Sequence, residues 1–103
     1  MPDATWKVCE RQVARRLGGE RAGPQGAASD VNHPWLSVEV KHRQGLPEWL
    51  KDAMEQAARN CTDADRLPIV VLHESGQRYG QSLVMMRLDD FCEWFANWEE
   101  VNG

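Results

Sequence analysis

The tripeptide Glu39-Val40-Lys41 brings together two side chains that could act on a phosphate. On an extended strand, alternate side chains point to the same face, so Glu39 and Lys41 would project together with Cα atoms about 6.6 Å apart. A carboxylate binds a hard cation such as Mg²⁺ through oxygen, and a neighbouring ammonium can orient water or stabilise charge on a phosphate. The pair therefore suits hydrolysis of a phosphodiester.

Corroboration is needed, because an acid two residues before a lysine is also the ordinary pattern of a solvated ion pair on a strand. Asp30 provides it, since it lies nine residues before Glu39 and follows a glycine-rich segment. A turn between adjacent strands would bring both carboxylates to one cation. Taken alone, Asp30 after Ser29 is equally typical of a turn.

Glu10 is a third carboxylate, in an unusual setting. Apolar residues recur every three or four positions over 5–17, as on an amphipathic helix, and Glu10 lies within about 50° of the centre of that stripe. Burial of an unpaired charge is expensive. Glu10 therefore requires a metal cation, a basic partner such as Arg11 or Arg15, or exposure at the margin of the stripe.

The N-terminal half has the elements needed to position these acids. The helix over residues 5–17 is predicted to end at Gly18-Gly19, as at a glycine C-cap. The segment 18–30 indicates a short strand or turn followed by a mobile loop. A strand is predicted over 36–41, with a short strand over 30–32 before it. Its expected inward-facing residues are Leu36, Val38 and Val40.

The rest of the chain alternates helix and strand. Pro47 suits the first turn of a helix that ends near Asn60. The apolar run 67–72 is typical of a central strand buried on both faces, with 83–86 as its neighbour across a hairpin connection. A last helix is predicted to begin at Asp89 or Asp90. Its aromatic stripe is Phe91, Trp94, Phe95 and Trp98.

Length and composition favour one domain. The chain has 103 residues, of which 42% are apolar, and its five Trp residues would supply a core if most point inward. No apolar run has the length of a membrane helix, and the N-terminus lacks the pattern of a secretory signal. We expect one soluble, cytoplasmic domain over residues 1–103.

The charge is unevenly distributed. The net charge is −4, but residues 1–51 carry +2 and residues 52–103 carry −6. Phosphate neutralisation by Lys and Arg provides most non-specific affinity for nucleic acids, so a basic N-terminal half favours contact with DNA there. Ordinary solubilisation of the first helix would use the same residues. The candidates for phosphate contact are Lys7, Arg11, Arg15, Arg16, Arg21 and Arg43.

These features together resemble the PD-(D/E)xK nuclease superfamily over roughly residues 6–73. The resemblance rests on a helix-borne Glu10, Asp30 after a glycine loop, Glu39-Val40-Lys41, and a following helix that bears Gln56. The small size and the element order α-β-β-β-α-β-β-α are most similar to archaeal and phage Holliday-junction resolvases and related phage-encoded nucleases. One departure is Ser29, where proline often precedes the aspartate.

The resemblance implies an α/β fold with a restriction-endonuclease-like core, a mixed sheet flanked by helices. It also implies Mg²⁺- or Mn²⁺-dependent hydrolysis of branched or duplex DNA, in recombination, repair or phage DNA processing, by a homodimer. Asp30, Glu39, the Val40 carbonyl and Glu10 would be the metal ligands. Lys41 would orient water or stabilise charge, and Gln56 would support the catalytic site.

Two other classes of protein remain open. One is a non-catalytic DNA-binding or assembly protein that keeps the nuclease fold and uses its acidic half for a protein partner. The other is a small accessory protein in which Glu39 and Lys41 only pair with each other on a wet surface. Glu10 far from Asp30 would favour the accessory protein.

Overall fold

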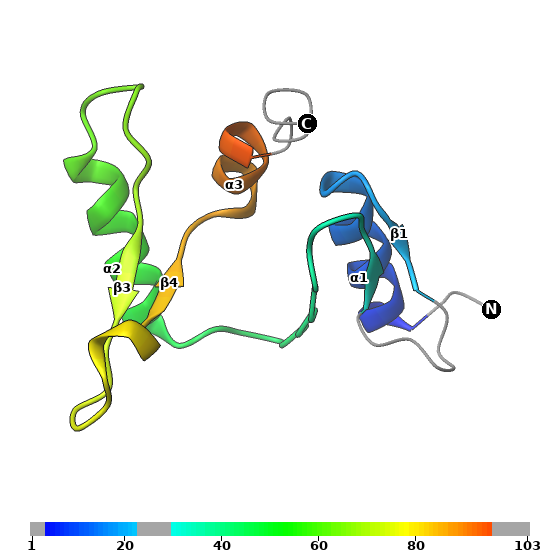
Figure 1. Ribbon diagram of the computed structural model, residues 1–103, viewed down its shortest axis with the longest axis horizontal. Coiled ribbons are helices and arrows are strands. Elements are labelled where there is room, and N and C mark those ends of the chain that lie inside the picture. The colour runs from blue at the N-terminus through cyan, green and yellow to red at the C-terminus, as the bar shows by residue number, and fades with distance from the viewer. Residues whose placement is uncertain (1–3, 23–29, 96–103) are drawn as a thin grey trace. The chain divides into compact units, whose positions relative to one another are not determined.

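The computed structural model describes residues 4–22 and 30–95, and its helices and strands form two compact units, residues 1–44 and 45–103. Within the described ranges there are three α-helices and two small antiparallel sheets, which confirms an α/β composition (Figure 1). No helix in those ranges is both long enough and apolar enough to cross a membrane. The two units are described separately below.

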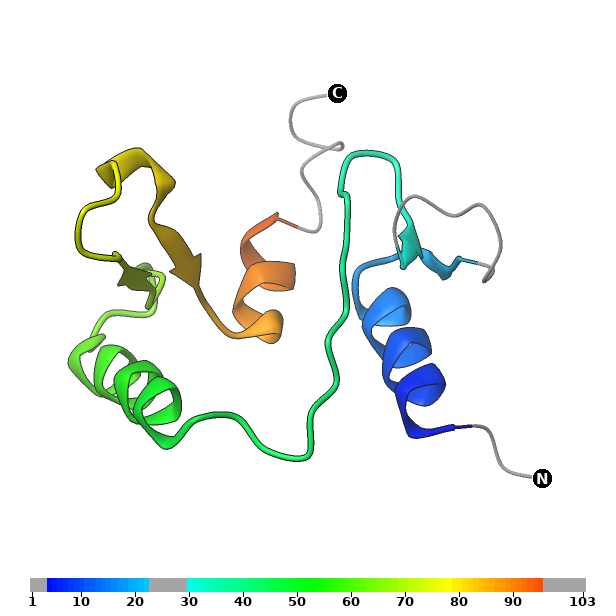
Figure 2. The same ribbon diagram turned by 90° about the horizontal axis from the view of Figure 1, so that it is seen from below.

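The first unit is a helix packed on a two-stranded sheet. Helix α1 (Thr5–Arg16) lies against strands β1 (Glu20–Arg21) and β2 (Val31–Asn32), which pair antiparallel (Figure 2). The α1 bounds match the predicted helix, and a strand at 30–32 is confirmed as β2. The predicted mobile loop falls largely on residues 23–29, outside the described ranges.

A glycine pair ends α1, as the sequence predicts. Gly18 has a φ of +76°, its N–H donates to the Arg15 carbonyl at 3.2 Å, and the Gly19 N–H donates to the Ala14 carbonyl at 2.9 Å. These two bonds form a Schellman cap, in which a left-handed glycine satisfies carbonyls that the helix leaves unpaired. The chain thereby reverses directly into β1.

Gly19 has a separate role, which is to let β2 approach closely. A Cβ on Gly19 would lie 2.3 Å from the Asn32 carbonyl oxygen and 2.9 Å from the Val31 side chain. Val31 is 2% exposed, and the small residues Ala14 and Ala22 are 2% and 5% exposed. Small side chains at this junction hold the helix and the sheet at short range, so Val31 fills the core of the first unit.

The prediction of a regular strand over 36–41 is wrong. Within that segment only Val38 makes a bridge, to Val31, although Leu36, Val38 and Val40 do alternate with exposed neighbours as expected. The Val40 N–H donates to the Asp30 carboxylate instead of to a strand carbonyl. Short polar side chains compete with sheet ladders for backbone groups in this way. The segment is therefore extended but not paired as a strand.

The second unit is a helix beside a β-hairpin, followed by a short helix. Helix α2 (Glu48–Asn60) contacts strand β3 (Val70–Leu72), which pairs antiparallel with β4 (Leu83–Met85), with Val71 opposite Val84. The predicted hairpin connection contains a turn at Gly76, whose φ is +86°, and a 3-10 turn, η1 (Tyr79–Gln81). Helix α3 (Leu88–Phe95) begins one residue before Asp89.

One prediction for this unit is wrong. The run 67–72 is not a central strand buried on both faces, because β3 has one neighbour and Val71 is 58% exposed. Pro68 precedes the strand, and proline has no N–H to give to a ladder. Both sheets in the described ranges are two-stranded and antiparallel, so the expected mixed sheet is not observed there.

The four tryptophans in the described ranges do not form a core. Trp6, Trp35, Trp49 and Trp94 are 40% to 62% exposed. On α3 the half-buried apolar residues are Leu88, Phe91, Cys92 and Phe95, so Trp94 leaves the predicted aromatic stripe, and Trp98 lies outside the described ranges. Among the described residues of the second unit, Met54 is the buried apolar residue, at 7% exposure.

The close approach at Gly19 gives a stability prediction. Gly19→Ala places a methyl group against backbone and should lower the free energy of unfolding by about 1–3 kcal/mol, as overpacking does. Gly45→Ala is the matched control, because nothing lies within 4 Å of the point that its Cβ would occupy. Urea denaturation followed by circular dichroism measures both. Equal stability of the two variants would contradict the role of Gly19.

Candidate metal centre

Asp30 is held by three hydrogen bonds, one to Ala22 and two to the segment 38–40. Its N–H donates to the Val38 carbonyl at 2.8 Å, and its carbonyl accepts from the Ala22 N–H at 3.0 Å. Its side-chain Oδ2 accepts from the Val40 N–H at 2.6 Å. The short distance is typical of a bond to a charged acceptor. The Asp30 carboxylate is therefore fixed on the backbone of the Glu39-Val40-Lys41 tripeptide.

Glu39 and Lys41 project together, as the alternation predicts. Lys41 Nζ lies 3.0 Å from Glu39 Oε1, and the Lys41 and Glu39 side chains are 76% and 61% exposed. The hydrogen bond to Glu39 raises the pKa of Lys41, with attraction to the same carboxylate as the next cause. A raised lysine pKa keeps the ammonium charged at neutral pH, and on the alkaline side the ion pair is lost as pH rises through the titration of Lys41. Lys41 is therefore a cation in this arrangement and not a base.

Two further charges act on Lys41. The negative charge of Asp30 also raises the Lys41 pKa, whereas the positive charge of Arg43 lowers it. Both effects require that Asp30 and Arg43 lie within electrostatic range of the ammonium. Together with the bond from Val40 to Asp30, this places two carboxylates, a lysine and an arginine around one stretch of backbone.

Glu10 has the basic partner that its position on α1 requires, but the partner is Arg21. Arg21 Nε donates to Glu10 Oε2 at 2.6 Å, with the two side chains only 19% and 14% exposed. The Arg21 guanidinium also lies 5.5 Å from the centroid of the Trp6 ring, a cation–π contact. Arg11 and Arg15, the partners that the sequence suggests, do not fill this position. Strand β1 aims Arg21 inward.

The described residues contain no group of three or more His, Cys, Asp and Glu side chains that could hold a metal ion. Asp30 and Glu39 lie at the tripeptide, while Glu10 is engaged by Arg21. Gln56 is exposed on α2, in the second unit, so its supporting role stays a prediction. The metal-ligand roles of Asp30, Glu39, Val40 and Glu10 also stay predictions.

The predicted phosphate contacts lie mostly on the surface of the first unit. Arg11, Arg15, Arg16 and Arg43 are exposed, and Lys7 is half-buried with its ammonium 5.5 Å from the Trp6 ring centroid. Arg21 differs from them, because its guanidinium is committed to Glu10 and Trp6.

Comparison with known proteins does not place the chain in a family. No family model, no curated protein and no solved structure matches it. Functional assignment therefore rests on the geometry of the first unit and on the sequence resemblance.

Two residues with structural roles at this site are not identified by the sequence patterns. From the sequence, Arg21 is a candidate for phosphate contact. Strand β1 is only two residues long, so an alternation of side chains along it is too short to reveal that Arg21 points inward. His33 forms no metal-ligand spacing with another histidine, so it attracts no functional assignment. Its position directly before Pro34 is the available signal, since polar residues before proline often initiate turns.

The half-buried Glu10–Arg21 pair gives a stability prediction. Arg21→Met leaves the Glu10 carboxylate without its partner and should cost about 1.5–3 kcal/mol, the usual value of a hydrogen bond to a charged group. Lys51→Met is the matched control, because Lys51 forms an exposed 3.0 Å pair with Glu48 and should lose no measurable stability. Urea denaturation compares them. An Arg21→Met protein as stable as the control would contradict the role of Arg21.

Proposed function

We propose that this protein is a Mg²⁺-dependent deoxyribonuclease of the PD-(D/E)xK type that hydrolyses phosphodiester bonds in branched or duplex DNA. The observation that carries the proposal is the 2.6 Å bond from the Val40 N–H to Asp30 Oδ2. It holds the carboxylate of Asp30 against the tripeptide that supplies Glu39 and Lys41, in the order that the superfamily motif requires. The restriction-endonuclease-like core belongs to the same proposal.

The donor atoms suit Mg²⁺ in kind. The Asp30 and Glu39 carboxylates and the Val40 carbonyl are hard oxygen ligands, and Mg²⁺ is usually bound by one or two protein carboxylates with water and substrate phosphate completing its shell. Two acids at the tripeptide are therefore sufficient, without a third at close range. When bound, such an ion polarises the phosphate and lowers the pKa of an attacking water.

Lys41 supplies a positive charge next to these acids. Its pKa is raised by Glu39, so it cannot serve as a general base near neutral pH. As an ammonium it can donate hydrogen bonds to a phosphate oxygen and stabilise the charge that develops during cleavage. Because its pair with Glu39 is exposed, exchanging that partner for a phosphate costs little.

Binding of DNA would use the exposed cations of the first unit. Arg43 lies within electrostatic range of Lys41, and Arg11 and Arg15 are exposed on α1. Arginine contacts to phosphate position a duplex without reading its sequence. Substrate choice would then follow from the shape of the DNA. The homodimer implied by the resemblance stays a prediction, as does a role in recombination, repair or phage DNA processing.

A second candidate is an accessory protein in which the tripeptide has no chemistry. The exposed 3.0 Å pair between Lys41 and Glu39 favours it, because a plain surface ion pair has the same geometry. The position of the Asp30 carboxylate is the observation that favours the nuclease. A surface ion pair needs no second acid fixed at its backbone, whereas a metal centre does.

Cleavage of labelled branched and duplex DNA in Mg²⁺ tests the proposal. Lys41→Ala and Asp30→Asn should each lower the cleavage rate by at least about 100-fold, because the first removes a cation that would stabilise the phosphate charge and the second removes a carboxylate that would hold Mg²⁺. Lys51→Ala is the matched control, since it removes an exposed lysine from an equally short ion pair. Circular dichroism confirms that each variant is folded.

The proposed function fails if the wild-type protein cleaves none of these substrates in Mg²⁺ or Mn²⁺. It also fails if Lys41→Ala cleaves as fast as Lys51→Ala, since the tripeptide would then have no catalytic role.

A further inference from the structure

His33 uses both of its ring nitrogens to connect segments that are distant in sequence. Nε2 lies 2.9 Å from the Leu17 carbonyl oxygen, and Nδ1 lies 3.3 Å from the Trp35 nitrogen and 3.2 Å from the Leu36 nitrogen. A carbonyl can only accept and an amide N–H can only donate. The ring must therefore carry its proton on Nε2 and accept at Nδ1, which fixes the neutral Nε2–H tautomer.

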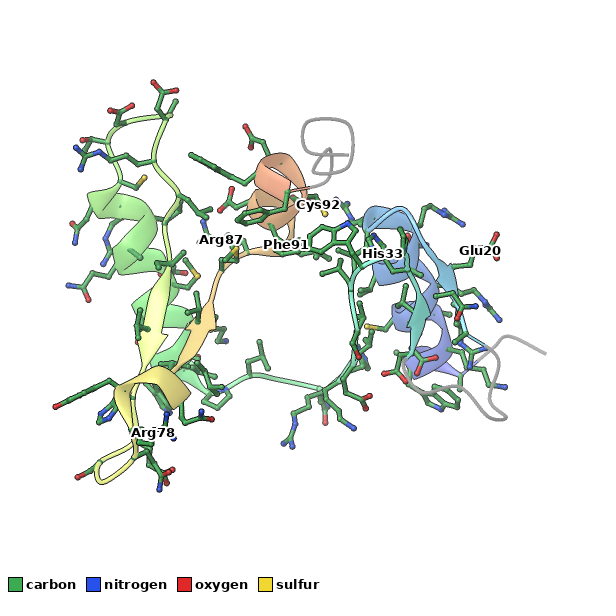
Figure 3. All side chains as sticks on the ribbon, viewed as in Figure 1. Glu20, His33, Arg78, Arg87, Phe91 and Cys92 are labelled. Atoms are coloured by element: carbon green, nitrogen blue, oxygen red, sulfur yellow. The ribbon has the colours of Figure 1, made fainter. Side chains whose placement is uncertain are left out.

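The Leu17 carbonyl lies at the end of α1, where carbonyls lack helical partners. The N–H groups of the glycine cap donate to the Ala14 and Arg15 carbonyls. The Nε2–H of His33 donates to the Leu17 carbonyl, and Figure 3 shows His33 beside the C-terminal end of α1. The histidine thus pairs with a carbonyl that the glycine cap leaves open.

The Nδ1 contacts shape the turn that returns the chain to Asp30. His33 directly follows β2, and its acceptance of the Trp35 and Leu36 amides closes a turn over 33–36. The Trp35 ring packs edge-on against the imidazole, with ring centroids 5.6 Å apart. After this turn Val38 meets Val31 and the Val40 N–H reaches Asp30. The turn therefore sets where the tripeptide lies.

We infer that His33 is a positioning residue for the proposed cleavage reaction, because its Nδ1 closes the turn that leads to Glu39 and Lys41, while its Nε2 contact with Leu17 orients the ring for that role. The inference rests on the proposed function for its catalytic consequence, but the geometry it describes is independent of that function. The ring nitrogens of His33 contact backbone groups at the helix end and in the turn. His33 therefore acts through the backbone of residues 33–40, which brings the Val40 amide to the Asp30 carboxylate.

Three substitutions separate the Nε2 contact with Leu17 from the Nδ1 contacts with the turn. His33→Ala removes both kinds of contact. His33→Asn keeps an oxygen acceptor near the Nδ1 position, and asparagine before proline readily forms the same kind of turn. His33→Gln keeps a donor near the Nε2 position but loses the acceptor for the turn. His73→Ala is the control, because His73 makes a comparable 2.8 Å contact to the Gln77 carbonyl on the hairpin of the second unit.

DNA cleavage kinetics give the first readout. His33→Ala should lower kcat at least about 10-fold, since small displacements of catalytic groups are costly, and leave KM for DNA within about 2-fold. His33→Asn should recover most of kcat, His33→Gln less, and His73→Ala should match the wild type. An unchanged kcat in His33→Ala, or a recovery by Gln that exceeds that by Asn, would overturn the inference.

Backbone and imidazole NMR give a second readout that needs no activity. The wild-type His33 ring should show the Nε2–H tautomer, and the Val40 amide resonance should move in His33→Ala but stay near its wild-type position in His33→Asn. If His33→Ala does not fold, His33→Asn still tests the turn. A Val40 resonance that moves in His33→Asn, or a wild-type Nδ1–H tautomer, would overturn the inference. Absence of cleavage by the wild type would instead remove the proposed function alone.

Discussion

The first unit depends on the three hydrogen bonds of Asp30. Its backbone joins the residue after β1 to the extended segment that follows β2, and its carboxylate accepts the Val40 amide. One short side chain therefore replaces a rung of a sheet ladder and at the same time places a negative charge beside Glu39 and Lys41. The fold and the proposed chemistry therefore use the same carboxylate. Asp30 thereby joins its own segment to Ala22 and to the segment 38–40.

The acids of this unit differ in how available they are to a cation. Glu10 is held by Arg21 in a half-buried pair, whereas Glu39 is held by Lys41 in an exposed pair. Desolvated, hydrogen-bonded pairs resist loss of one partner, while exposed pairs exchange partners with solvent and ions at little cost. Glu39 is thus more available to a cation than Glu10 is. Glu10 contributes more directly to the attachment of β1 to α1 than to a metal shell.

The sequence predicts the parts of the structure that depend on local pattern. The bounds of α1, the glycine cap at Gly18 and the alternating burial of 36–41 follow from periodicity and backbone preference. The partner of Glu10 and the contact of His33 with Leu17 do not, because each joins residues eleven or more positions apart. Segment 36–41 does not form a strand because the Asp30 side chain takes the Val40 amide. Strand propensity describes the preferences of the residues in the segment, so it does not include competition from the side chain of Asp30.

The position of a bound metal tests the central claim, a metal centre at Asp30 and Glu39, most directly. Mn²⁺ added to the ¹⁵N-labelled protein broadens the amide resonances closest to it. We predict that the resonances of Asp30, Glu39 and Val40 broaden at the lowest Mn²⁺ concentrations, and that Asp30→Asn abolishes this selectivity. Broadening that begins elsewhere, such as at the acidic turn of Asp63 and Asp65, or no selective broadening at all, would contradict a metal centre at these residues.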